Sequence, residues 1–229
     1  MTLEDFKEGQ VLLIDKPLNW TSFQVVNKIR WHIRQKFNIK KIKVGHAGTL
    51  DPLATGLLIL CTGKFTKKIE TYQAQIKEYT GEITLGATTP SYDLETEIDK
   101  TFSIDHISKE LIHETTKQFI GDIDQKPPIF SAIKKEGKRL YDLARAGETT
   151  EIKARRIHIS EFEITKINLP KVEFRVVCSK GTYIRSLAYD FGLALNSGAH
   201  LSKLRRTKIG EFVVIDNLGP EEYIEKYLF

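Results

Sequence analysis

VGHAGTLDPLATGLLILC, residues 44–61, joins a glycine-rich segment to the longest purely apolar run of the chain. Glycine permits a positive φ and close backbone approach, so residues 44–56 are expected to form a structured loop. The apolar run at 57–61 predicts a buried strand. A loop that places polar residues at the edge of such a strand is a typical setting for chemistry.

Outward from this stretch, the spacing of apolar residues predicts more strands than helices. Strands are expected at 9–15, 77–85, 155–165, 172–178, 204–209 and 211–215, and helices at 107–120, 182–195 and from Pro220. This mixed order predicts an α+β fold built on a mixed sheet. We expect one continuous domain over residues 1–229, with residues 124–153 as a basic excursion from the sheet.

A further helix is expected to begin at Thr21-Ser22-Phe23-Gln24, which has the pattern of a capping box. Its apolar positions recur at helical spacing and are expected to face the core: Phe23, Val26, Ile29 and Ile33. The helix at 107–120 is expected to bury Ile107, Leu111 and Phe119.

The composition indicates a globular protein with a real core. The chain has 229 residues, of which 41% are hydrophobic and 28% are charged, and this excludes a disordered chain. No run approaches the ~20 apolar residues of a membrane span, and the acidic start is unlike a signal peptide. Cys61 and Cys178 belong to no CxxC pair, so we expect a cytoplasmic protein without a structural zinc site.

The charge is unevenly distributed along the sequence. Residues 16–68 contain eleven Lys and Arg but a single acid, Asp51, whereas residues 93–124 contain nine acids and three lysines. Clustered cations are typical of proteins that bind a phosphate backbone. Solvated helix faces, an acidic metabolite or a membrane surface are the alternatives that charge alone leaves open.

Several known cofactor and metal motifs are broken in this chain. Gly63-Lys64-Phe65 lacks the earlier glycine and the Ser/Thr of a phosphate loop, and His113-Glu114 lacks the second histidine of a zinc protease. The nucleophile elbow and the dinucleotide fingerprint are also missing from the sequence. We therefore expect no cofactor and no metal, and an enzyme that works with side chains alone.

Asp51 is the first candidate for a catalytic group. A carboxylate at a strand edge, surrounded by cations, has the chemistry of a nucleophile or base acting on an anionic substrate. The alternative is structural, since Asp-Pro also favours a turn.

Three other residues have two readings each. Arg185 follows an apolar helix position and needs a carboxylate partner, for which Asp51 and Asp190 are candidates. Tyr79 is either a stacking aromatic or an ordinary strand tyrosine. His46 either bonds the local backbone or contacts RNA.

At these residues the chain resembles the TruB family of pseudouridine synthases. The matching motifs keep their order over residues 10–210. They are Leu12–Pro17 with Thr21-Ser22, Gly45–Gly56, Lys77–Tyr79, Gln125–Pro128, Ser179–Arg185 and Gly198–Arg206. The resemblance implies the pseudouridine synthase fold, a central and mostly antiparallel mixed sheet flanked by helices and loops.

The resemblance also implies roles for single residues. Asp51 is the implied catalytic aspartate, Tyr79 the aromatic that stacks on the target base, and Arg185 the ion-pair partner of Asp51. Tyr183 and Leu204 are implied to enclose the target nucleotide, and His46 to take the place of the extruded nucleotide in the RNA loop. The basic residues expected to bind substrate are Lys16, Lys67, Arg205 and Arg206.

The implied reaction converts uridine 55 in the T loop of tRNA to pseudouridine, a redox-neutral isomerisation without a cofactor. Residues around 124–153 are implied to close over the RNA, and no full C-terminal RNA-binding domain is expected. We expect a monomer whose partner is the T stem-loop of tRNA, with no membrane and no metal. A non-catalytic RNA-binding or RNA-folding module and a guide-dependent synthase within a ribonucleoprotein are the alternatives.

Overall fold

The computed structural model describes residues 1–131, 134–135, 138–139, 141, 152–214 and 218–228. Its contacts divide the chain into two compact units, Met1–Tyr79 with Leu204–Phe229 and Thr80–Lys203. Among the described residues, no helix has the length and apolar character needed to cross a membrane.

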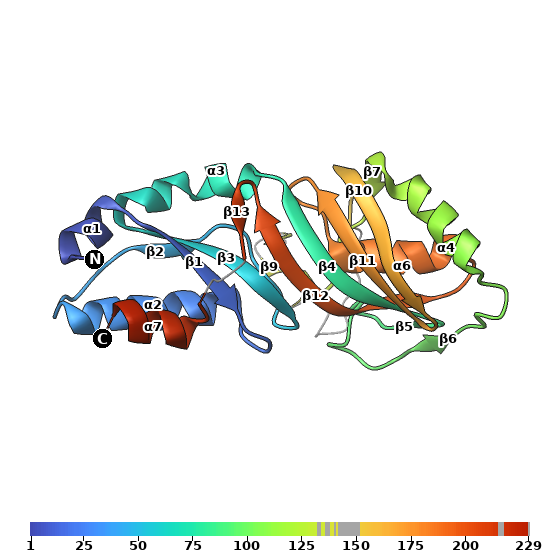
Figure 1. Cartoon of the computed structure of the whole chain (residues 1–229), viewed down its shortest axis with the longest axis horizontal. Coiled ribbons are helices and arrows are strands. Elements are labelled where there is room, and N and C mark those ends of the chain that lie inside the picture. Colours follow the sequence, from blue (N-terminus) through green and yellow to red (C-terminus); the bar gives the residue numbers. More distant parts are fainter. Residues whose placement is uncertain (132–133, 136–137, 140, 142–151, 215–217, 229) are drawn as a thin grey trace. The chain divides into compact units, whose positions relative to one another are not determined.

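The first unit is built around strand β3 (Ala54–Thr62) (Figure 1). Strand β1 (Val11–Lys16) pairs with β3 in antiparallel register along one edge. On the other edge lie β2 (Val44–His46), antiparallel, and β12 (Ala199–Ile209), parallel through Leu204–Arg206. The remaining elements are α1 (Leu3–Glu8), α2 (Ser22–Lys36), η1 (Gly63–Lys68), α3 (Ile69–Ala74), β13 (Phe212–Val213) and α7 (Pro220–Tyr227).

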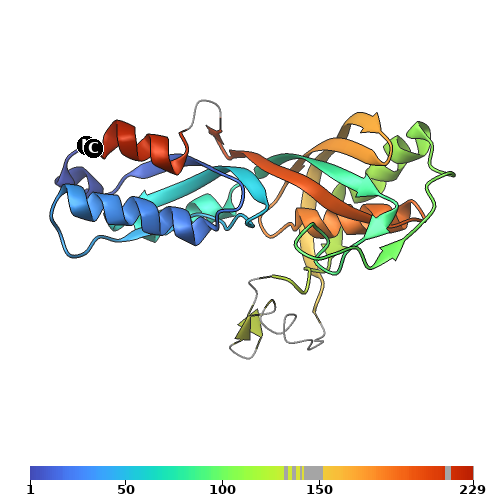
Figure 2. The same ribbon diagram turned by 90° about the horizontal axis from the view of Figure 1, so that it is seen from below.

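Strand β3 is buried on both faces, which explains its uninterrupted apolar run. Leu58 and Leu60 belong to a cluster that includes residues of α2 and α7, which lie side by side (Figure 2). Leu57, Ile59 and Cys61 face a second cluster, against which Ile69 and Tyr72 pack. The predicted strand at 57–61 is therefore confirmed, and it begins three residues earlier.

Helix α2 begins as the sequence predicts. Thr21 is its N-cap and forms a complete capping box with Gln24. The predicted inward face is wrong at one position, because Phe23 is 62% exposed and Val25 is fully buried. Val25, Val26, Ile29 and Ile33 together form the continuous stripe that meets the core, and Phe23 lies outside it.

The second unit is a sheet in the order β4 (Lys77–Leu85), β11 (Lys171–Cys178), β10 (Arg155–Asn168) and β7 (Gly121–Gln125). Strands β4 and β12 are neighbours in the sheet, and each contributes residues to both units. The other elements are β5 (Ala87–Thr88), β6 (Lys100–Thr101), α4 (Lys109–Thr116), η2 (Lys117–Phe119), β8 (Lys134–Lys135), β9 (Lys138–Arg139) and α6 (Ile184–Ala194).

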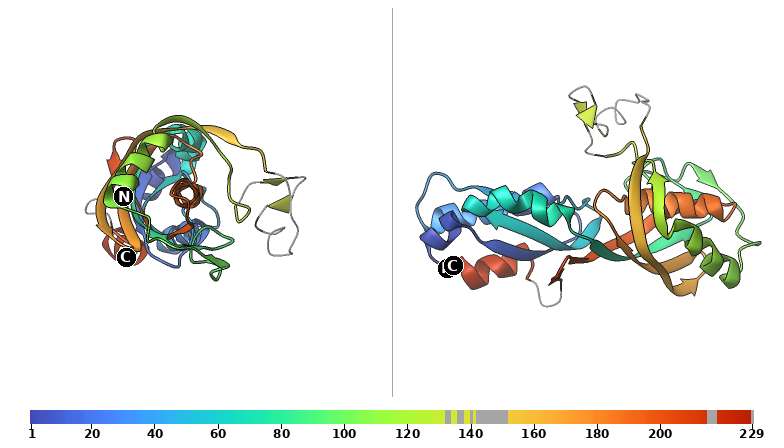
Figure 3. Two further views of the ribbon diagram at one scale, coloured as in Figure 1. Left: turned by 90° about the vertical axis from the view of Figure 1, so that its right-hand side faces the viewer. Right: turned by 90° about the horizontal axis from the view of Figure 1, so that it is seen from above.

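Aromatic side chains hold this second unit together. Phe191 of α6 lies 5.4 Å from Phe162 of β10, ring centroid to ring centroid, and Phe162 lies 6.0 Å from Phe174 of β11. Helix α6 therefore packs against these strands (Figure 3). In the helix predicted at 107–120, Ile112 is buried where Leu111 was expected, and Leu111 is 37% exposed.

The predicted α+β fold with a mixed sheet is confirmed. Strands at 77–85, 155–165 and 172–178 and helices at 182–195 and from Pro220 are present, with ends shifted by up to three residues. Much of the predicted excursion at 124–153 lies outside the described residues.

Candidate active site

Asp51 lies in the loop between β2 and β3, where its neighbours fix the backbone. The Oγ of Ser22, the first residue of α2, accepts a hydrogen bond from the Leu50 N–H at 2.8 Å and donates to the Leu50 carbonyl at 3.1 Å. The Ala54 N–H donates to the Asp51 carbonyl at 3.0 Å. The turn expected of Asp-Pro is thus present, and it places Asp51 just before the buried strand.

The residue after Asp51 is fixed by a second set of donors. The backbone N–H of Asn19 donates to the Pro52 carbonyl at 2.8 Å. The Lys16 ammonium reaches the same carbonyl at 3.5 Å and also donates to the carbonyls of Pro17 at 2.8 Å and Trp20 at 2.6 Å. Asp51 is therefore anchored from both sides, by a helix start and by a buried lysine.

Burial sets the electrostatics of Lys16, whose residue is 0% exposed. The pKa of its ammonium is lowered to about 8, chiefly by loss of solvent and in part by the positive charge of Arg206. The negative charges of Asp51 and Asp15 act in the opposite direction. Lys16 is therefore a buried cation within electrostatic reach of the Asp51 carboxylate.

Arg206 holds the other end of the loop. Its Nε donates to the Leu57 carbonyl at 2.8 Å and its Nη2 to the Gly48 carbonyl at 3.1 Å, while the residue is 1% exposed. The parallel pairing of β12 with β3 places Arg206 opposite Gly56. A Cβ on Gly56, whose φ is +104°, would lie 2.2 Å from the Arg206 carbonyl oxygen, so this close approach requires glycine.

Arg205 faces a different carboxylate, which the sequence did not single out. Its Nη1 and Nη2 donate to the two oxygens of Asp15 at 3.1 and 2.6 Å, a bidentate pair. Asp15 lies on β1 and Arg205 on β12, with β3 between these strands. Their pairing depends on strand order, so no local motif could have revealed it.

The other predicted residues of the first unit occupy different settings. His46 lies on β2 opposite Leu60 of β3, and burial together with the positive charge of Arg206 lowers the pKa of its ring. Its buried Nδ1 has no hydrogen-bond partner among the described residues. Tyr79 is buried on β4, Leu204 is half-buried on β12 and Lys67 is exposed in η1.

Arg185 and Tyr183 belong to the second unit. Arg185 is 4% exposed, donates to the Ser91 carbonyl at 3.2 Å and has its Nε 3.6 Å from Asp93 Oδ2. Asp93 is thus a carboxylate partner that sequence reasoning missed. Tyr183, the N-cap of α6, is held by its backbone, which exchanges two hydrogen bonds with the Gln125 side chain at 2.8 and 3.0 Å.

These contacts show which of the predicted site residues hold the backbone near Asp51. The predicted RNA contacts of Lys16 and Arg206 stay predictions, as does the ion pair of Asp51 with Arg185. In the structure, Lys16 and Arg206 donate hydrogen bonds to the backbone on either side of Asp51 and so hold it in place. In the described part of the chain, no group of three or more His, Cys, Asp or Glu side chains could hold a metal ion.

Comparison with protein families gives two matches, which together cover residues 34–225. Residues 34–184 match the N-terminal domain of the TruB family pseudouridylate synthases, and residues 185–225 match the tRNA pseudouridylate synthase B C-terminal domain.

The relatives agree with this family. A protein of Flavobacterium johnsoniae named tRNA pseudouridine synthase B is 69% identical over 215 residues, which are 93% of this chain and 94% of that protein. A protein of the same name from Phocaeicola vulgatus is 60% identical over 96% of this chain and 94% of its own length.

Among solved structures, the chain is similar to one in a Cbf5-Nop10-Gar1 complex, with a TM-score of 0.71 and 30% identity. The similarity covers 99% of this chain and 58% of that one. A chain in an H/ACA RNP bound to a substrate RNA containing 2′-deoxyuridine gives a TM-score of 0.69 at 28% identity, over 98% of this chain and 55% of that one. With its Asp51 loop and family matches along most of its length, this chain belongs to the TruB family of pseudouridylate synthases.

Proposed function

We propose that this protein converts uridine 55 in the T loop of tRNA to pseudouridine, acting as a monomer in the cytoplasm. The observation that carries the proposal is the Asp51 loop, in which Ser22, Lys16 and Arg206 hold the backbone on both sides of the carboxylate. Such support is what a catalytic group needs to keep its geometry during the reaction. The relatives named tRNA pseudouridine synthase B match nearly the whole chain and support the same substrate.

The proposed reaction replaces one glycosidic bond of the target nucleotide by another. The target uridine leaves the base stack, since its reacting atoms are inaccessible within it. The bond from C1′ to N1 breaks, the base rotates, and C5 joins C1′. The proton on C5 is lost and N1 ends with a proton, so atoms balance without an oxidant or reductant.

Asp51 starts this reaction, either by adding to C1′ or by removing the 2′ proton to give a glycal. Both routes require an ionised carboxylate. Tyr79 stacks on the base, and Tyr183 and Leu204 enclose it so that the detached base stays in place for religation. Arg185 pairs with Asp51, His46 fills the space of the extruded nucleotide, and Arg205 and Lys67 contact the RNA.

A second candidate is a guide-dependent synthase in a ribonucleoprotein. Its support is the similarity to chains solved in an H/ACA RNP and in a Cbf5-Nop10-Gar1 complex. The higher identity to tRNA pseudouridine synthase B proteins favours an enzyme that needs no guide. Activity of the purified chain on a tRNA transcript, with no other RNA present, distinguishes the two candidates.

The proposal is tested with a tRNA transcript labelled with tritium at C5 of uridine. Wild-type protein should release tritium in proportion to the pseudouridine formed, and a transcript with cytidine at position 55 should release none. Tight binding of the transcript without any release would overturn the proposal and would favour an RNA-binding or RNA-folding module.

A further inference from the structure

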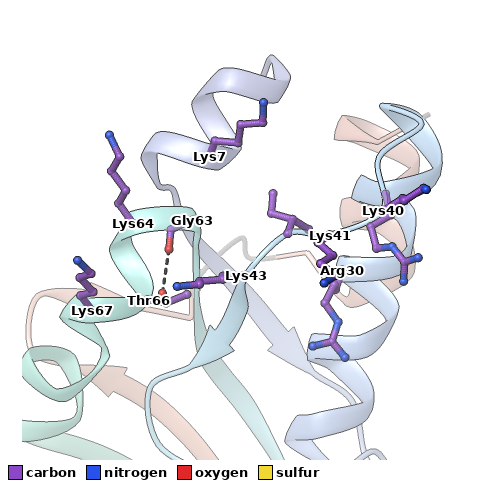
Figure 4. Close-up of a pocket in the computed structure, with 11 residues that line it drawn as sticks. Lys7, Arg30, Lys40, Lys41, Lys43, Gly63, Lys64, Thr66 and Lys67 are labelled. Carbon is purple, nitrogen blue, oxygen red and sulfur yellow. Dashed lines mark hydrogen bonds between the residues drawn. The ribbon is translucent and has the colours of Figure 1, made fainter.

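A basic hollow of about 750 Å³ lies in the first unit (Figure 4). Its lining includes eight cationic side chains and no carboxylate. They come from α1, α2, the segment 37–43 and η1: Lys7, Arg30, Arg34, Lys40, Lys41, Lys43, Lys64 and Lys67. We name this set of residues the basic pocket.

Backbone contacts make the basic pocket a defined structure. The Gly63 N–H donates to the Lys43 carbonyl at 2.9 Å, and the Thr66 hydroxyl donates to the Gly63 carbonyl at 2.8 Å. Gly63 has a φ of +49°, and a Cβ there would lie 2.0 Å from the Lys7 carbonyl oxygen. Three chain segments therefore converge at Gly63, where only glycine fits.

Most of these cations have no carboxylate to neutralise them. Lys64 pairs with Glu8 at 2.6 Å and Lys7 with Glu4 at 3.9 Å, both outside the lining. The other six cations of the pocket form no ion pair with an acid within the described ranges: Arg30, Arg34, Lys40, Lys41, Lys43 and Lys67. The Nε of Arg34 is also buried, and it has no hydrogen-bond partner in the described part of the chain. Such uncompensated charge opposes folding, and a bound polyanion relieves it.

The distance from Asp51 indicates which part of a bound RNA would meet the basic pocket. Asp51 precedes the first residue of β3, while Gly63 follows its last residue, Thr62. Nine strand residues at roughly 3.3 Å each separate the two sites by about 25 to 30 Å. Phosphates bound here therefore belong to a part of the RNA well removed from the target nucleotide.

We infer that the basic pocket binds the sugar-phosphate backbone of tRNA outside the T stem-loop. The inference rests on the proposed function for the identity of the RNA. The pocket offers lysines and arginines with no aromatic side chain among its lining residues, a composition suited to phosphates and not to stacked bases. Its contribution is affinity for whole tRNA, and the chemistry at Asp51 does not depend on it.

The test replaces Lys40, Lys41 and Lys43 together by glutamine and measures the Kd for whole tRNA and for its isolated T stem-loop. We expect binding of whole tRNA to weaken about tenfold or more, with unchanged Kd and tritium release for the stem-loop. The matched control replaces three exposed lysines of the second unit, Lys100, Lys109 and Lys117, and should change neither Kd. Removing like charges should leave the thermal midpoint of the pocket variant equal or higher.

Equal weakening for both RNAs, or no weakening for either, would overturn the inference. A pocket variant that loses whole-tRNA binding while wild-type protein releases no tritium would contradict the proposed function and leave the pocket assignment intact.

Discussion

At the scale of single residues, the cations near Asp51 act on the backbone. Lys16 and Arg206 are almost fully buried and donate to carbonyls of the loop and its flanks. The sequence predicts that this region is basic, since eleven cations surround one acid. It does not reveal that Arg206 is buried, because that depends on β12 pairing with β3 across about 150 residues of sequence. The partner carboxylates Asp15 and Asp93 were missed because each lies far along the sequence from its arginine, Arg205 or Arg185.

The lowered pKa of Lys16 predicts a pH dependence. As the pH rises through about 8, Lys16 loses its charge and one donor to the loop, so the isomerisation rate should fall. Lys16→Arg keeps the charge, and this alkaline limb should move above pH 10. Single-turnover rates between pH 6 and 9.5 measure both variants.

Unfolding does not explain such a loss. The pKa of Lys16 is about 8 in the folded chain and near 10.5 in an unfolded one, so between these values the unfolded chain binds the proton more tightly. The Lys16 contribution to the free energy of unfolding therefore increases over this window. An identical alkaline limb in wild type and Lys16→Arg would contradict the role given to Lys16.

At the scale of elements, the start of α2 and the edge of β3 determine the loop geometry. The capping box and the apolar run are local patterns, so the sequence predicts both elements well. The link between them is not local, because Ser22 reaches Leu50 across 28 residues. Phe23 shows the limit of periodicity, since it has helical spacing yet lies outside the buried stripe.

Ser22→Ala should uncouple helix and loop. It leaves the buried N–H and carbonyl of Leu50 without their partner, and we expect a loss of about 1–3 kcal/mol in the free energy of unfolding. The turnover number should also fall, because the residue next to Asp51 is no longer fixed. Thr21→Ala is the matched control, since it removes the cap of the same helix at a cost of about 1 kcal/mol and should leave turnover unchanged. Equal turnover in the two variants would exclude a positioning role for Ser22.

Gly56→Ala tests the approach of β12 to β3. The new Cβ would meet the Arg206 carbonyl at 2.2 Å, so the loss of unfolding free energy should exceed about 3 kcal/mol. Gly121→Ala is the control, because Gly121 also has a positive φ, +96°, with nothing within 4 Å of the added Cβ. Its cost should be limited to about 1–2 kcal/mol of backbone strain. Chemical denaturation measures both, and similar losses would show that the strand contact is unimportant.

At the scale of the whole molecule, the net charge of +5 belongs to one unit. The first unit has 17 basic and 12 acidic residues, and the second has 18 of each. The excess of basic residues seen in the sequence is therefore confined to the first structural unit. The division itself was not predictable, because the strands β4 and β12 that run through both units have continuous local patterns.

This charge predicts a strong salt dependence of tRNA binding. Each neutralised phosphate should contribute a slope of roughly −0.7 to −0.9 in a plot of log affinity against log salt concentration. Glutamine at three positions of the basic pocket should reduce the slope by about 2 to 3. Filter binding between 50 and 300 mM salt measures it, and a slope unaffected by these substitutions would show that the pocket meets no phosphate.

The central claim is that Asp51 performs the chemistry while other residues hold the RNA. The most direct test compares wild type with Asp51→Asn for tritium release from a uridine-labelled tRNA transcript and for the Kd of the same transcript. We predict that Asp51→Asn abolishes release and keeps the Kd within a few-fold, since phosphate contacts lie elsewhere. Substantial release by Asp51→Asn would contradict the account.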